Sequence, residues 1–112
     1  MELAGKALKD FWIWYLLPEQ QKEYKTNSLI KFGNENSAKV RFLAMSFTER
    51  YGVFVDFFDS INIVIEDCKN HRINSFYFMV NGELGIIVNT RNESRIEAVK
   101  KANEIYNYEN YR

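Results

Sequence analysis

Hydrophobic residues recur every three or four positions over residues 3–17, which is the period of an α-helix with one apolar face. Pro18 disfavours helical geometry at the residue before it, so this first helix is predicted to end there. Residues 19–45 are largely polar, with an apolar piece at 29–32 and a Gly/Asn-rich turn signal after it. We therefore expect a long loop over 19–45 that carries at most one edge strand.

A second helix is predicted to begin at Ser46, because Ser46 and Glu49 have the S-x-x-E spacing of a helix-capping box. Beyond this cap, one helical face would be apolar, and the opposite face would carry Gly52, Asp56 and Asp59. If the segment were a strand, Asp56 would lie between two phenylalanines on one face, where an unpaired carboxylate is costly. The helix is the favoured interpretation. The predicted apolar face consists of Tyr51, Phe54, Val55, Phe58 and Ile61.

From Ile61 the pattern changes to strict alternation, which predicts a strand over 61–66, followed by a polar connection over 67–74. Residues 75–80 predict a second strand, and Asn-Gly at 81–82 is a strong signal for a tight hairpin turn. Residues 83–90 would return as a third, antiparallel strand, with a bulge marked by Gly85.

The last predicted helix starts after Thr90, which has a glutamate three residues later, and its apolar stripe runs to Tyr106. Residues 108–112 are expected to fray. The chain is then one α+β domain spanning 1–112: two N-terminal helices, a three-stranded antiparallel sheet, and a C-terminal helix packed on the sheet.

The 112 residues suffice for one domain, and a composition of 46% hydrophobic and 16% aromatic residues favours a folded core. The 15 basic residues equal the 15 acidic ones, so no net charge draws the whole chain to nucleic acid or an anionic membrane. The apolar run at 11–18 is shorter than the roughly 20 residues of a membrane-spanning helix. The single Cys68 and the lack of a secretory signal pattern predict a cytoplasmic protein with no membrane partner.

Two pairs of residues have spacings that catalysis or metal binding could use. Asp56 and Asp59 could hold a hard cation or act as an acid and base, but no second acidic pair accompanies them. Cys68 and His71 could form half of a zinc site or a nucleophile and base, but one Cys and one His do not complete a tetrad. Nucleotide-binding and serine-hydrolase motifs are absent. We expect a non-enzymatic protein without catalytic residues, metal or cofactor, and a metal-dependent enzyme at Asp56 and Asp59 is a distant alternative.

A surplus of large apolar side chains predicts a protein interface. Trp12 and Trp14 do not fit on one narrow helix face, and Val53 and Phe57 fall on the flank of the second helix. Exposed aromatic groups mark interfaces with other proteins or with a second copy of the chain, although the 19–45 loop would hide them if it folded over. The predicted partner-binding residues are Trp12, Trp14, Val53, Phe57, Asp56 and Asp59.

A small nucleic-acid-binding domain is the alternative function, because basic residues interleave with aromatic ones and a basic strip runs along the last helix. This interpretation predicts binding that weakens steeply as salt rises. Its candidate residues are Lys31, Lys39, Arg41, Arg91, Arg95, Lys100 and Lys101.

The stretches SFTERYGVFVDFFDSINIVI and NTRNESRIEAVKKANEIYN add a resemblance. Residues 46–65 and 81–107 resemble a group of small uncharacterised phage and prophage proteins, which have a GV..DFFDS helix before a strand and a closing helix that ends in ANEIYN. The resemblance implies a phage accessory protein of unknown role, and it carries over no catalytic or binding residue. Together with the surplus of aromatic residues and the lack of catalytic motifs, it leads us to expect a factor in the host cytoplasm that occludes the surface of a host protein, with inhibition of an anti-phage defence as one such role.

Overall fold

The computed structural model describes residues 1–23 and 35–110, and these form helices and one three-stranded antiparallel sheet. The C-terminal helix packs on the sheet, so the predicted α+β class is confirmed. None of the described helices combines the length and the apolarity that crossing a membrane requires. The elements are α1 (Gly5–Tyr15), α2 (Pro18–Glu23), α3 (Glu35–Leu43), α4 (Phe47–Ser60), β1 (Ile65–Asn70), β2 (Ser75–Val80), β3 (Glu83–Leu84) and α5 (Arg91–Asn110).

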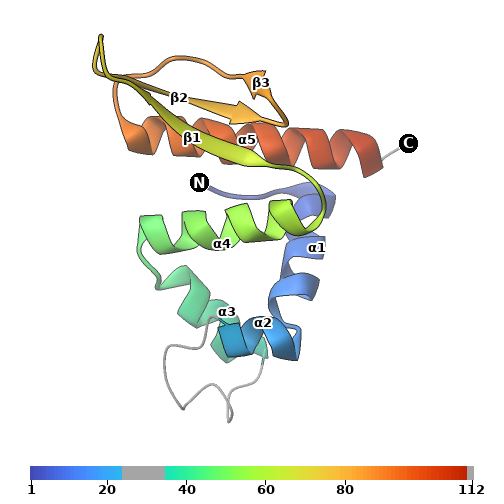
Figure 1. Cartoon of the computed structure of the whole chain (residues 1–112). Helices are drawn as coiled ribbons and strands as arrows, with labels where there is room; N and C mark the ends of the chain where they lie inside the picture. Colours follow the sequence, from blue (N-terminus) through green and yellow to red (C-terminus); the bar gives the residue numbers. More distant parts are fainter. Residues whose placement is uncertain (24–34, 111–112) are drawn as a thin grey trace.

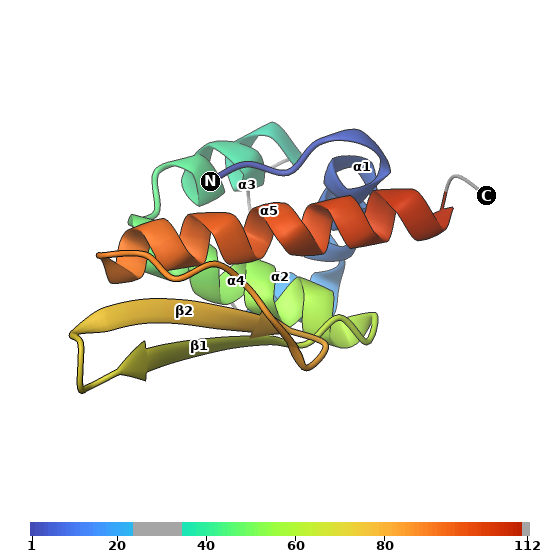
Figure 2. The same ribbon diagram turned by 90° about the horizontal axis from the view of Figure 1, so that it is seen from above.

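The sheet has the order β1-β2-β3, and the turn between β2 and β3 is the predicted Asn-Gly pair. Asn81 and Gly82 have φ angles of 52° and 81°, as a tight hairpin turn requires. Figure 1 shows α5 lying across one face of the sheet, and Figure 2 shows that no described helix covers the opposite face. The sheet therefore has one packed face and one open face.

Strand β1 begins later and extends further than predicted. Residues 61–64 connect the end of α4 to β1: Ile61 is the C-cap of α4, and Asn62 has a φ of 65°. Ile63 is buried although it is not part of a strand. The predicted polar connection over 67–74 is wrong in its first half, because Asp67 to Asn70 pair with β2. The alternation of apolar residues ends at 65, and hydrogen bonds to β2 continue the strand beyond it.

The third strand is shorter than predicted and is interrupted by a bulge. Leu84 lies opposite Met79 and Val88 lies opposite Phe76, so the register shifts by one residue between these pairs. Two residues, 86 and 87, then stand opposite a single residue of β2, which is the geometry of a β-bulge. Just before it, Gly85 donates its N–H to the Phe78 carbonyl at 2.8 Å, and a Cβ on Gly85 would lie 2.2 Å from the Phe78 ring.

The core centres on Phe11 of α1, which is fully buried. Trp12, Trp14 and Tyr15 come from the same helix, and rings from α3 and α4 complete the shell. Such aromatic pairs, in edge, tilted and stacked arrangements, add to the stabilisation that comes from area burial. We call this set the Phe11 cluster: Phe11 with the rings of Trp12, Trp14, Tyr15, Phe42, Phe54 and Phe57 at centroid distances of 5.0 to 6.1 Å.

The loop predicted over 19–45 is wrong in its described part, because α2 and α3 occupy much of it. Ala38 and Phe42, four residues apart, are both buried, and the Phe42 ring lies 5.1 Å from that of Phe11. The mostly polar composition of α3 conceals this two-residue apolar stripe. The edge strand predicted at 29–32 lies outside the described residues.

Helix α4 begins where it was predicted to begin. The Ser46 hydroxyl accepts from the N–H of Glu49 at 3.2 Å and donates to the Glu49 carboxylate at 3.0 Å. Asp56 and Asp59 are exposed, as expected. The apolar face is wider than predicted, because Val53 and Phe57 are also buried.

Helix α5 extends to Asn110, so residues 108–110, which were expected to fray, are helical, and 111–112 lie outside the described residues. Its side chains also cap α1, which has no side-chain cap of its own. Asn103 Oδ1 accepts from the Ala4 N–H at 2.9 Å, and Asn107 Oδ1 accepts from the Ala7 N–H at 2.8 Å. Asn107 Nδ2 also donates to the Ala4 carbonyl at 2.9 Å. These bonds satisfy polar groups that a helix start otherwise leaves unpaired.

Candidate functional site

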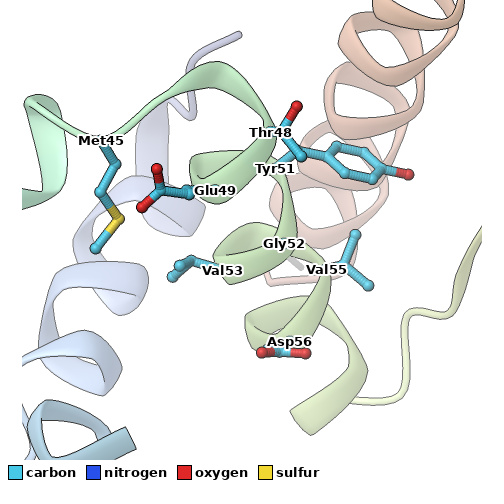
Figure 3. A pocket seen from close by; sticks show the side chains of 8 residues that line it. All are labelled: Met45, Thr48, Glu49, Tyr51, Gly52, Val53, Val55 and Asp56. Atoms are coloured by element: carbon cyan, nitrogen blue, oxygen red, sulfur yellow. The ribbon is translucent and has the colours of Figure 1, made fainter. Parts of the chain in front are cut away.

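A shallow groove of about 430 Å³ runs over the exposed side of α4. Gly52 lies in its middle, where a Cβ would meet no atom within 4 Å, so the missing side chain creates the depression. Figure 3 shows the flanking side chains on both sides of Gly52. The residues of this α4 groove are Met45, Thr48, Glu49, Tyr51, Gly52, Val53, Val55 and Asp56.

The α4 groove has a mostly apolar lining with a carboxylate on each side of its middle. Glu49 is one helical turn before Gly52 and Asp56 one turn after it. Among residues 1–23 and 35–110, no three His, Cys, Asp or Glu side chains are grouped so as to hold a metal ion. Burial, and then the neighbouring Asp67 charge, raise the pKa of Tyr51 to about 12, so its phenol is neutral at physiological pH. The groove can accept an apolar side chain with cations beside it.

The predicted partner-binding residues do not form one surface. Val53 and Phe57 have only 3% and 2% of their surface exposed, so the expectation that they project to a partner is wrong. Phe57 packs against Phe11 and Trp14 of α1, and Val53 belongs to the same buried core. Trp12 and Trp14 are half-buried and contact the Phe11 ring, while Asp56 and Asp59 are exposed.

A group of exposed aliphatic side chains lies at the free edge of the sheet, and the sequence pattern does not single it out. Leu84, Ile86 and Ile87 expose 66%, 56% and 59% of their surface. We call residues 84–88 the β3 edge. The uncharged run LGIIV is the available signal, and it predicts a strand without indicating whether another strand pairs with it.

Backbone groups at the β3 edge point away from the sheet. The Gly85 N–H bonds to Phe78, so these two residues form a hydrogen-bonded pair. Leu84, the next residue in the ladder, belongs to a pair whose N–H and C=O groups face outward. β3 is the last strand in the sheet order, so the outward groups of Leu84 face a side without a described strand.

A second cavity, of about 410 Å³, lies beside the β3 edge, and we call it the edge groove. Phe78 and Val80 contribute apolar surface, and Glu97 and Lys101 contribute charges from α5. The edge therefore offers hydrogen-bonding backbone, exposed aliphatic side chains and an adjacent cavity. The edge groove is lined by Phe78, Val80, Glu83, Leu84, Gly85, Ile86, Glu97 and Lys101.

Charged residues from β1 and α5 meet at Asp67. Asp67 Oδ2 lies 3.1 Å from Arg91 Nη1 and 3.1 Å from Arg95 Nε. The Arg95 guanidinium also stacks 4.8 Å from the Tyr51 ring centre and reaches Thr48 Oγ1 at 3.4 Å, so it joins α5 to α4.

Phe76 lies next to this ion pair and has cations on its ring. Lys69 Nζ is 5.4 Å from the ring centroid, and the Arg91 guanidinium carbon is 5.1 Å from it. Cations at this range are attracted to the face of an aromatic ring. We call Asp67, Lys69, Phe76, Arg91 and Arg95 the Asp67 cluster.

The residues predicted for nucleic-acid binding are divided among separate places. Lys39 lies 5.3 Å from the Trp12 ring and Arg41 is in the last turn of α3, whereas Arg91 and Arg95 are in the Asp67 cluster. Lys100 and Lys101 are exposed on α5, and Lys31 lies outside the described residues. Lys39 and Arg41 therefore lie on α3, and the residues of the predicted basic strip lie on α5.

The remaining predicted pair, Cys68 and His71, belongs to the β1–β2 hairpin. Cys68 is half-buried in β1 opposite Tyr77, and His71 is exposed in the turn.

Comparison with known proteins found no match to this chain among protein-family models, curated proteins or solved structures. The interaction surfaces described above therefore carry the functional argument.

Proposed function

We propose that this protein is a non-enzymatic binding factor that receives an extended segment of a partner protein at the β3 edge. The main observation in support is that three exposed aliphatic side chains and outward-facing backbone groups lie at the same edge of the sheet. Natural proteins normally protect such edges with charge or cover them, because an open apolar edge pairs with other chains. An added strand would bond to the backbone and place alternate side chains in the edge groove.

Charges beside the edge define the chemistry of the partner segment. Residues 84–90 carry no charge, so the added strand is expected to be apolar where it lies against them. Lys101 on the α5 side of the edge groove matches an acidic residue, and Glu97 and Glu83 match basic ones. The α4 groove offers side chains alone and is the weaker candidate for this role.

The resemblance to small phage proteins suggests the biological setting of this proposal. The partner would be a host protein in the host cytoplasm, and strand addition would occlude part of its surface. Inhibition of an anti-phage defence protein is one role of this kind. A second copy of the chain pairing through the same edge is the competing occupant, which the test below distinguishes.

The test compares captures from host lysate by tagged wild-type protein and by an Ile86→Lys, Ile87→Lys variant. Lysine on an edge strand opposes pairing with another chain. The matched control is Ile13→Lys, which places lysine on an equally exposed isoleucine of α1. The proposal expects one host protein to be retained by wild type and Ile13→Lys and lost from the edge variant.

A second variant, Leu84→Pro, removes the outward N–H without removing a bond to β2. It is expected to weaken the same capture while circular dichroism remains unchanged. Equal capture by all variants, or no partner, would overturn the proposal. Light scattering that shows a wild-type dimer and a monomeric edge variant would also overturn it, in favour of self-association.

A further inference from the structure

The Asp67 cluster holds more positive than negative charge. Lys69, Arg91 and Arg95 supply three cations, and Asp67 supplies one carboxylate. Arg72 in the neighbouring turn and Glu93 in the first turn of α5 offset each other. Two positive charges therefore remain uncompensated in a small region, and an anion would relieve their mutual repulsion.

Helix geometry adds to this positive field. The N-terminal ends of α4 and α5 and the β1–β2 hairpin turn lie at the same end of the molecule (Figures 1 and 2). The bond from Arg95 to Thr48, in the first turn of α4, ties the two helix starts together. A helix N-terminus carries about half a positive charge, which favours phosphate and other anions. Ser46 and Thr90 each accept one N–H at these starts. The first-turn Glu93 and Glu49 offset part of the charge, although Glu49 lies on the side of α4 that faces the α4 groove.

The cluster divides its cations into buried and accessible ones. The Arg95 side chain is 17% exposed and is held by Asp67, Tyr51 and Thr48. The Arg91 side chain is 45% exposed and bonds to Asp67 through one guanidinium nitrogen. Arg91 and Lys69, on the same ring, can therefore donate to a ligand, while Asp67 and Arg95 hold the cluster in place.

From this arrangement we propose that the Asp67 cluster binds the backbone phosphates of single-stranded nucleic acid. A guanidinium fork and an ammonium point charge are the side-chain groups that bind phosphate oxygens most strongly. Arg72, Lys69 and Arg91 extend from the hairpin turn to the start of α5, and a chain of phosphates would engage more than one of them. This surface is separate from the β3 edge, and it stands or falls independently of the proposed protein partner.

The experiment measures fluorescence anisotropy of a labelled oligothymidylate at about 50 and 200 mM salt, where phosphate contacts weaken steeply. Lys69→Ala and Arg91→Ala are each expected to weaken binding about fivefold and to reduce the salt slope by about 0.7. Lys9→Ala, which removes an exposed lysine of α1, is the matched control and should bind as wild type does.

Asp67→Asn gives a result that a purely structural role would not produce. It removes the compensating negative charge while keeping a similar shape, so binding should tighten in protein that circular dichroism shows to be folded. Absent binding, or equal binding by Lys69→Ala and Lys9→Ala, would overturn the proposal. Calorimetry with inorganic phosphate distinguishes a site for free phosphate from a site for the phosphates of a nucleic-acid backbone. Binding of phosphate without binding of the oligonucleotide would also overturn the proposal.

Discussion

The Phe11 cluster and the Asp67 cluster both join elements that are distant in the sequence, and they do so by different forces. The Phe11 cluster joins α1, α3 and α4 through aromatic rings that exclude water. The Asp67 cluster joins β1, β2 and α5 through charges that stay partly in contact with solvent, and its Arg95 also contacts α4. The packed rings offer a ligand no exposed polar group, whereas the Asp67 cluster retains cations that a ligand can reach.

This difference predicts how each cluster responds to a change at its centre. The Phe11 cluster should fail through lost packing, and it should be insensitive to salt and to pH near neutrality. The Asp67 cluster should fail through an unpaired charge. Four measurements address this comparison, from the largest expected effect to the smallest.

Phe11→Ala should have the largest effect, because it removes the ring that six others contact. We expect the free energy of unfolding to fall by about 3–5 kcal/mol, as for other large-to-small changes in a core. Urea denaturation followed by circular dichroism measures this. Ile13→Ala, on the exposed side of the same helix, should change it by less than about 0.5 kcal/mol. Similar losses in the two variants would contradict the central role of Phe11.

Asp67→Ala should cost about 2–3 kcal/mol, because Arg95 is left partly buried without its carboxylate. The double variant Asp67→Ala, Arg95→Ala should recover part of this loss, and a double-mutant cycle measures the coupling. Asp59→Ala is the control, since Asp59 is exposed and unfavourably placed near the C-terminus of α4. A loss no greater than that of the control would show that the ion pairs contribute nothing to stability.

Asn107→Ala tests whether α1 depends on α5 as well as on the Phe11 cluster. The change leaves the Ala7 N–H without its partner and leaves the Ala4 carbonyl with only the longer bond from the Leu8 N–H. We expect a loss of about 1–2 kcal/mol, which is typical of a removed helix cap. Thermal unfolding against Asn92→Ala, an exposed asparagine at the other end of α5, provides the comparison.

Asp10 provides the smallest test, through pH. Hydrogen bonds from Tyr106 and then from Lys6 lower the pKa of Asp10 below its ordinary value of 3.8. A lowered folded-state pKa contributes stability that is complete above 3.8 and is lost as pH falls through the folded value. The stability difference between wild type and Asp10→Asn should therefore be constant near neutrality and shrink below about pH 4. A difference that stays constant down to about pH 2 would contradict this.

The sequence predicted those elements whose capping residues, turn residues and hydrophobic period lie within the element itself. Ser46 with Glu49 and Thr90 with Glu93 placed the starts of α4 and α5, and the Asn-Gly pair placed the β2–β3 turn. α3 was missed because its helical signal is one buried pair, Ala38 and Phe42, within a polar segment. A short polar helix gains its stability from tertiary packing, which propensity does not report.

The two interaction surfaces were harder to predict. Arg91 and Arg95 were visible as basic residues of a helix, but their common partner Asp67 was placed in a connection. The exposure of Leu84, Ile86 and Ile87 does not follow from the sequence, because an uncharged apolar run has the same pattern whether or not another strand pairs with it.

The sequence by itself determined the α+β class, the helix caps, the hairpin turn and the solvated positions of Asp56 and Asp59. These depend on residues a few positions apart, so their physical causes are local. The tertiary structure alone decided that Val53 and Phe57 are core, that Asp67 binds two arginines, and that no strand of the described residues pairs with the outer side of β3. Each of these depends on which distant element packs against which face, and burial and charge pairing between distant residues leave no periodic trace in the chain.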